Sequence, residues 1–315
     1  MTNKQKTPVF IVSAGRSGST FLAKLINDHP DIVCVSDLFE PVGPAPYFDR
    51  ETKISGTDFF NMIAAPSTKP RLRYWRERQT KERLFVPEDE GLVSLLLSYT
   101  IPFVDDDPMT CLSDYQNFVA REPEQSPADH LISFFEWLKE RCGAEMWVER
   151  TGGALALTPE IIKTWPDAKI IHNYRDGREC CISMLNYPFF RMYLEMMENP
   201  DLDEWDFDAA PPIEDVGKMW SDWVLIAEDA MESVPEKQKR WVAYEDLMGE
   251  TENTLTTLVK YIFERDELSA VDKKWIQECV ERVKPSALKF EGLNENDQEK
   301  LMDACAPGLK RLGYL

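Results

Sequence analysis

The stretch that decides the fold runs from residue 8 to 26 and reads PVFIVSAGRSGSTFLAKLI. Residues 8–14 form a short apolar run, which is typical of a buried strand. Residues 15–19 are mostly small and suit a tight turn. The apolar residues that follow recur at helical spacing: Phe21, Leu22, Leu25 and Ile26. The stretch therefore predicts a strand, a tight loop and a helix in direct succession.

The loop between that strand and helix has the composition of an anion cradle. Its backbone N–H groups are expected to point outward at the positive end of the helix dipole. Gly15 and Gly18 allow sharp turns and close approach of a ligand to the backbone. Further donors come from three hydroxyls: Ser17, Ser19 and Thr20. The loop predicts a bound phosphate, and the alternative is an ordinary tight turn whose small residues only relieve crowding.

The same loop departs from the phosphate loop of kinases and NTPases. That loop needs the pattern G-x-x-x-x-G-K-[ST], whereas this chain has neither the spacing nor a lysine after Gly18. A P-loop kinase or NTPase, which requires Mg²⁺, thus stays open as a weaker alternative.

Four further apolar runs predict strands at 32–35, 146–148, 169–174 and 240–244. Their hydrophobicity is continuous, which indicates a parallel sheet with helices on both faces, in an α/β fold. The stretch 41–140 is irregular, with prolines and acidic patches, and predicts a mainly helical insertion. We expect one domain over residues 1–315.

Charge and composition narrow the class of partner and compartment. The net charge is −20, from 36 Lys plus Arg against 56 Asp plus Glu, so nucleic acids and other polyanions are disfavoured. No signal segment or membrane span is predicted, and we expect a cytoplasmic protein. The seven cysteines show no CxxC pair, so they are expected to be reduced thiols without a metal.

A second anion anchor is predicted at residues 169–183, which read KIIHNYRDGRECCIS. This is another strand that leads into a helix, with Arg175 at the strand end and Ser183 eight residues later. The planar fork of an arginine suits a phosphate. By itself, an Arg-Asp pair at a strand end is more often a structural ion pair.

The two anchors together resemble the sulfotransferases that depend on 3′-phosphoadenosine 5′-phosphosulfate (PAPS). GRSGSTFL at 15–22 is similar to their 5′-phosphosulfate loop, in the form that carbohydrate-type and bacterial members carry. Arg16 stands where cytosolic members usually have lysine. The segments WVERT at 147–151 and YEDL at 244–247 resemble further family motifs, whereas Gly177 replaces a usual proline.

The resemblance implies a P-loop-like fold, PAPS as donor and 3′,5′-adenosine bisphosphate (PAP) as product. It implies that residues 15–20 hold the 5′-phosphosulfate, that Arg175 and Ser183 hold the 3′-phosphate, and that Tyr244 lies near the adenosine. The acceptor is expected to be a small molecule or a neutral carbohydrate, shaped by the variable insertion. The sequence identifies neither the acceptor nor the oligomeric state.

Catalysis is expected to follow an in-line transfer through a loose transition state, without a metal ion. Arg16 would stabilise the bridging oxygen and the leaving phosphate. The resemblance places the general base at Glu40, and the alternative is a solvated or capping glutamate. None of the three histidines matches a catalytic histidine of the family: His29, His130 and His172. A non-catalytic PAP-binding protein, with both anchors but no working base, also stays open.

Overall fold

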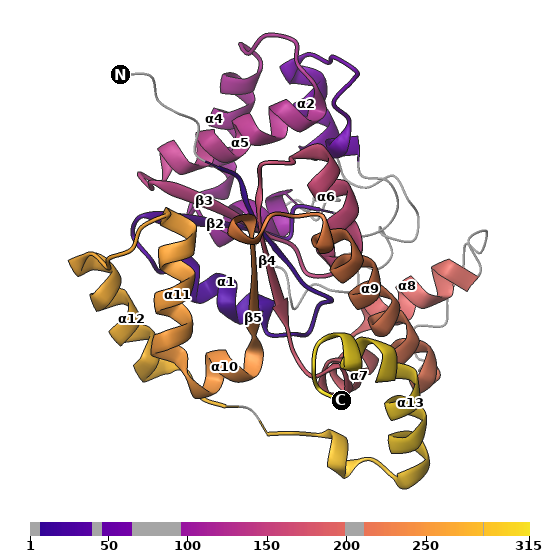
Figure 1. Cartoon of the computed structure of the whole chain (residues 1–315). Coiled ribbons are helices and arrows are strands. Elements are labelled where there is room, and N and C mark those ends of the chain that lie inside the picture. Colours follow the sequence, from indigo (N-terminus) through magenta and orange to yellow (C-terminus); the bar gives the residue numbers. More distant parts are fainter. Residues whose placement is uncertain (1–6, 40–45, 65–95, 199–210, 286) are drawn as a thin grey trace.

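The computed structural model describes residues 7–39, 46–64, 96–198, 211–285 and 287–315 (Figure 1). Five short strands form one sheet, in the order β2-β3-β1-β4-β5, and every neighbouring pair is parallel. The strands are β1 Val9–Val12, β2 Ile32–Ser36, β3 Met146–Arg150, β4 Lys169–Tyr174 and β5 Lys239–Ala243. The predicted parallel sheet is confirmed. Tyr244, which was expected to end the last strand, instead begins a helix.

Helices cover both faces of the sheet, as the continuous apolar strands predicted (Figure 1). Alternate residues of β1 serve two separate cores: Phe10 and Val12 face one, whereas Val9 and Ile11 face the other. The second core is closed by α1 Ser19–Asn27, α11 Thr251–Phe263 and α12 Ala270–Arg282. The first is closed mainly by α5 Pro127–Arg141, α6 Thr158–Thr164, α7 Gly177–Leu185 and α9 Ile213–Glu232.

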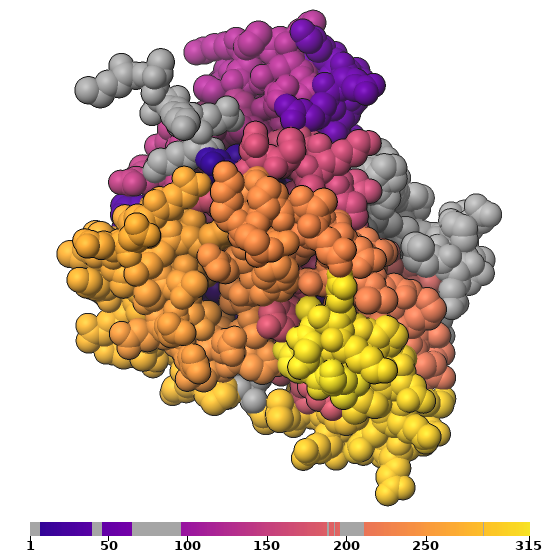
Figure 2. Space-filling model, in the orientation of Figure 1, coloured from indigo at the N-terminus to yellow at the C-terminus, as the bar shows by residue number. Residues whose placement is uncertain are grey.

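The remaining helices complete the layers around this sheet. They are α2 Gly56–Ala64, α4 Pro108–Val119, α8 Pro188–Glu198, α10 Tyr244–Gly249 and α13 Glu295–Arg311. The described part of the predicted insertion is helical, apart from one isolated bridge between Ile54 and Gln125. In Figure 2 the C-terminal residues, orange to yellow, cover much of the visible face. Within the described ranges, no helix combines the length and the apolar character that crossing a membrane requires.

The parallel arrangement determines where a ligand site can form. Since all five strands run in one direction, the segments that follow them gather at a single edge of the sheet. Binding sites of open α/β sheets lie outside this carboxyl edge. The first predicted anchor follows β1 and the second follows β4, which are hydrogen-bonded neighbours. The topology therefore brings the two anchors side by side.

Candidate active site

The loop after β1 has the backbone of an anion cradle. Gly15, Arg16 and Gly18 have φ values of 79°, 55° and 82°, so three of four successive residues are left-handed. For Arg16 this is an uncommon conformation for a residue with a side chain, of the kind that recurs at functional sites. Helix α1 begins directly afterwards at Ser19, and its first N–H groups have no partner within the helix. The loop can thus present several backbone donors to an anion.

Tyr244 lies between the two anchors. A Cβ atom on Gly18 would lie 2.5 Å from Cδ2 of the Tyr244 ring, so only glycine allows this approach. On the other side, Cζ of Arg175 lies 4.3 Å from the centroid of the same ring, which is a cation–π contact. The predicted adenosine residue therefore also fixes the strand-end arginine against the loop.

The two anchors meet through a direct hydrogen bond. Arg16 Nε donates to Ser183 Oγ at 3.0 Å, across 167 residues of sequence. A cavity of about 400 Å³ opens beside this contact. Seven of the predicted residues line it: Arg16, Gly18, Ser19, Thr20, Arg175, Ser183 and Tyr244. The structure thus brings both predicted phosphate sites into one cavity.

Three predicted site residues are not among the described residues that line the cavity: Gly15, Ser17 and Glu40. The buried Ser17 hydroxyl donates to Asn173 Oδ1 at 3.2 Å, which attaches the loop to β4. Gly15 faces Phe190, whose ring would lie 2.7 Å from a Cβ atom there. Ser17 thus fixes the loop through its hydroxyl, and Gly15 through its left-handed backbone. Glu40, the predicted general base, lies outside the described residues.

Sequence reasoning missed two lysines of the cavity. Lys284 and Lys289 line it from the segment between α12 and α13, far along the chain from both anchors. The buried Glu179 holds this segment, because its Oε1 accepts the N–H groups of Lys289 and Phe290 at 2.8 and 2.9 Å. The sequence KPSALK at 284–289, two lysines close together in an acidic chain, was the available signal.

The cavity is cationic in an anionic protein. Its lining side chains include one carboxylate, Glu179, whose Oε2 lies 3.7 Å from Arg175 Nη2. Against it stand four cations: Arg16, Arg175, Lys284 and Lys289. A local excess of positive charge in a chain of net charge −20 favours a small anionic ligand at this place. Among the described residues, no cluster of side chains could hold a metal ion.

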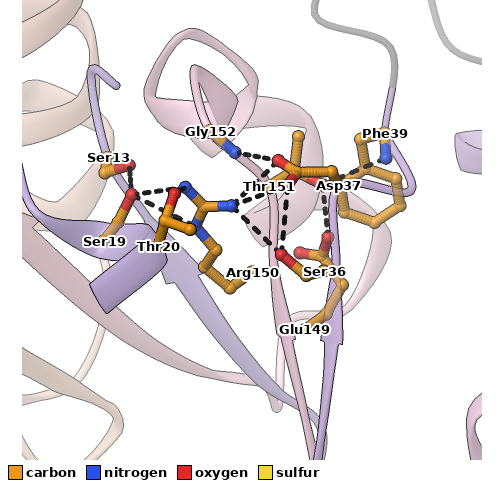
Figure 3. A network of polar contacts seen from close by, with 10 residues as sticks. All are labelled: Ser13, Ser19, Thr20, Ser36, Asp37, Phe39, Glu149, Arg150, Thr151 and Gly152. Carbon is orange, nitrogen blue, oxygen red and sulfur yellow. Dashed lines mark hydrogen bonds and ion pairs between the residues drawn. The ribbon is translucent and has the colours of Figure 1, made fainter. Parts of the chain in front are cut away.

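A buried polar network lies beside the loop, at the ends of β2 and β3 (Figure 3). The Arg150 side chain is 4% exposed, and its Nη1 lies 2.9 Å from both carboxylate oxygens of Asp37. Arg150 also donates to Ser19, Thr20 and Ser36. Arg150 thus forms a buried ion pair with Asp37 and holds three hydroxyls around it.

Glu149, the neighbour of Arg150, is an uncharged acid at moderate pH. It is fully buried, and this burial raises its pKa to about 8, although a hydrogen bond from the Thr151 hydroxyl at 2.5 Å opposes the shift. Thr151 Oγ1 in turn accepts the N–H of Phe39 at 3.1 Å. The network thus ties the segment after β2 to the carboxyl edge.

Fold and site together define a doubly wound α/β protein with an anion cavity at the carboxyl edge of its sheet. The sequence also matches the profile of the sulfotransferase family across residues 8–264, which is most of the chain. This chain belongs to the sulfotransferase family. No curated protein sequence matches it.

One solved structure agrees with this assignment at the level of the fold. The sulfotransferase domain from the curacin biosynthetic pathway is 12% identical, with 99% of each chain covered and a TM-score of 0.52. Sulfotransferases from Mycobacterium avium (STF9) and Alicyclobacillus acidocaldarius are 13% and 15% identical, with TM-scores of 0.48 and 0.42. The match to STF9 covers 97% of this chain and 76% of STF9. The match to the Alicyclobacillus enzyme covers 98% of this chain and 95% of that enzyme.

Proposed function

We propose that this sulfotransferase takes the sulfuryl group of PAPS and transfers it to a hydroxyl of a small-molecule or carbohydrate acceptor. The hydrogen bond between Arg16 and Ser183 carries the proposal, because it joins the loop after β1 to the helix after β4 beside one cavity. A nucleotide with phosphates at both ends of its ribose needs two such anchors close together. The four cations that line the cavity match such an anion.

Each anchor suits one part of the donor. The left-handed loop at 15–18 and the start of α1 offer backbone N–H groups, with the Ser19 and Thr20 hydroxyls, to the 5′-phosphosulfate. Arg175 and Ser183 offer a guanidinium fork and a hydroxyl to the 3′-phosphate. Tyr244 presents an aromatic face beside both, where the adenosine would lie.

The chain can promote transfer by placement and charge alone. When bound, PAPS supplies an activated sulfuryl group with the 5′-phosphate as leaving group. Arg16 and the loop donors are placed to stabilise negative charge on that phosphate, which is the usual task of a metal ion in phosphoryl transfer. We therefore propose a reaction that needs no metal.

The general base remains Glu40 in this proposal. The residue before it, Phe39, is buried and held at the carboxyl edge by its hydrogen bond to Thr151. A carboxylate at the acceptor side would take the proton from the attacking hydroxyl.

The test is transfer of labelled sulfate from PAPS to a panel of phenols, alcohols and neutral sugars, with and without a chelator. We expect transfer to at least one class, unchanged by the chelator. The Glu40→Gln variant should bind PAP normally and turn over about 100-fold or more slowly, because general-base catalysis contributes factors of this size. Glu51→Gln, an exposed glutamate, is the matched control. Equal turnover in both variants would eliminate Glu40 as the base.

A thermal-shift comparison of ligands, together with the transfer assay, separates the two alternatives. Thermal stabilisation by ATP with Mg²⁺ but not by PAP would indicate a kinase or NTPase. Binding of PAP without transfer to any acceptor would indicate a non-catalytic PAP-binding protein.

A further inference from the structure

Arg150 lies behind the donor cavity without reaching it. Arg150 is not one of the described residues that line the cavity, but two of its hydrogen-bond partners, Ser19 and Thr20, do line it. Nη2 donates to Thr20 Oγ1 at 2.6 Å and to Ser19 Oγ at 2.9 Å, and Nε donates to Ser19 Oγ at 3.1 Å. The guanidinium thus holds both hydroxyls of the first turn of α1 from the inner side.

These contacts determine what the two hydroxyls can still do. A hydroxyl has one hydrogen to donate and two lone pairs to accept with. Ser19 Oγ faces three donors, Nε and Nη2 of Arg150 and the Ser13 hydroxyl at 3.0 Å, so its two lone pairs are fully used. Arginine has no lone pair to offer in return, so neither Ser19 nor Thr20 can donate to it. Their hydrogens are left to point toward the cavity.

Asp37 keeps this arrangement fixed. Its two carboxylate oxygens lie 2.9 Å from Arg150 Nη1, and the carboxylate also accepts the Gly152 N–H at 3.1 Å and the Ser36 hydroxyl at 3.1 Å. The planar fork of an arginine can meet Asp37 on one side and two hydroxyls on the other, whereas the point charge of a lysine cannot. Only an arginine at position 150 can therefore make all of these contacts.

We propose that Arg150 is a positioning residue, which commits the Ser19 and Thr20 hydroxyls to donate into the anion cavity. This inference rests on the proposed function, since the anion is the 5′-phosphate of the donor. The competing explanation is a purely structural ion pair, which would stabilise the fold and have no energetic link to those two hydroxyls.

A double-mutant cycle on PAP affinity, measured by calorimetry, separates the two explanations. We expect Arg150→Lys to weaken binding about tenfold, and Ser19→Ala with Thr20→Val to weaken it by a similar factor, as for hydrogen bonds to a charged group. Combining all three changes should leave affinity within about twofold of the double variant, because Arg150 acts through those hydroxyls. Losses that multiply to about 100-fold, or normal binding by Arg150→Lys, would overturn the proposal.

Controls keep the outcomes distinct. Arg141→Lys changes a similar fork, in which Arg141 bonds Asp105 and Asp114 on the insertion, and should bind PAP as the unmodified chain does. If Arg150→Lys does not fold, Thr20 variants provide the test: Thr20→Ser should bind PAP within twofold of the unmodified chain, and Thr20→Val about three- to fivefold more weakly, which is part of the loss expected when both hydroxyls are removed. Equal affinity of those two variants would overturn the proposal. Failure of the unmodified chain to bind PAP would instead overturn the proposed function.

Discussion

The two edges of the sheet carry hollows that differ in size and in charge. The hollow at the carboxyl edge has about 400 Å³, and four cations and one carboxylate line it. The hollow at the amino edge, beside Pro8, Lys169 and Gln238, is larger at about 1020 Å³. Its lining has three cations and five carboxylates: Arg50, Lys169 and Lys237, then Glu122, Asp129, Glu136, Asp167 and Glu264.

The comparison favours the smaller hollow as the candidate anion site, because its charge and not its volume distinguishes it. At the amino edge carboxylates outnumber cations, and two of the cations form ion pairs: Lys169 with Glu264 at 2.9 Å and Arg50 with Asp129 at 3.5 Å. At the carboxyl edge the four cations come from three separate segments of the chain and line the same cavity. Burying or crowding like charges is unfavourable unless an opposite charge is bound there, so convergence indicates a ligand.

The largest expected effect is the loss of Arg175. Replacing it by alanine removes a guanidinium fork, and we expect PAP affinity to fall about 100-fold or more. Arg50→Ala removes an arginine from the hollow at the other edge and should change PAP affinity less than twofold. Calorimetric titration of both variants checks this. Similar losses in the two variants would show that charge at the carboxyl edge has no special role.

Gly18 gives the second test, with Gly143 as its counterpart. Both have positive φ, at 82° and 67°, but a Cβ atom on Gly18 would meet the Tyr244 ring, whereas one on Gly143 would meet nothing within 4 Å. Gly143 precedes β3 at the amino edge. We expect Gly18→Ala to weaken PAP binding about tenfold, and Gly143→Ala to leave it unchanged with a stability loss of about 1 kcal/mol. Titration and thermal unfolding measure the two effects. Normal binding by Gly18→Ala would contradict the described loop.

The cavity lysines should have smaller effects. Lys284 and Lys289 are exposed, so each should contribute a few-fold to PAP affinity at low salt, through attraction that salt screens. The Lys284→Ala and Lys289→Ala double variant should therefore also show a weaker dependence of affinity on ionic strength. Lys237→Ala at the amino edge is the control. An unchanged salt dependence in the double variant would remove the two lysines from the donor site.

The smallest expected effect concerns stability and pH. Glu149 has a folded pKa of about 8, above its value of 4.5 when unfolded, so the folded chain holds an extra proton between these pH values. Stability should therefore fall as pH rises from about 5 to 8. Glu149→Gln should reduce this slope and raise the melting temperature at pH 8 by about 2–4 °C. Asp167→Asn, which changes an exposed carboxylate at the amino edge, should alter neither the slope nor the melting temperature at pH 8. An identical pH profile for Glu149→Gln would contradict the buried acid.

Much of the fold could be predicted from the sequence, because local patterns determine it. The run at 8–26 has the composition of a strand, a turn and a helix, and the remaining strands are continuous apolar segments that a covered parallel sheet requires. Arg175 and Ser183 could be predicted for the same reason, since Arg175 follows a strand directly and Ser183 lies in the helix that comes next. The resemblance to a family gave them their roles.

Other features depend on tertiary contacts that no local pattern contains. Lys284 and Lys289 belong to the site only because Glu179, more than 100 residues earlier, binds their segment. The partners of Arg150 could not be predicted either, because its fork joins the first turn of α1 to the segment after β2. The Ser17 hydroxyl, a predicted phosphate donor, bonds Asn173 instead, which follows from the pairing of β1 with β4.

The most direct test of the two-anchor cavity compares the affinity of the unmodified chain for PAP and for adenosine 5′-monophosphate. The two ligands differ only in the 3′-phosphate. Calorimetry should show that PAP binds about 50-fold or more tightly, and that Arg175→Ala removes this preference. Equal affinity for both nucleotides, or a preference that survives in Arg175→Ala, would contradict the assignment of two phosphates to one cavity.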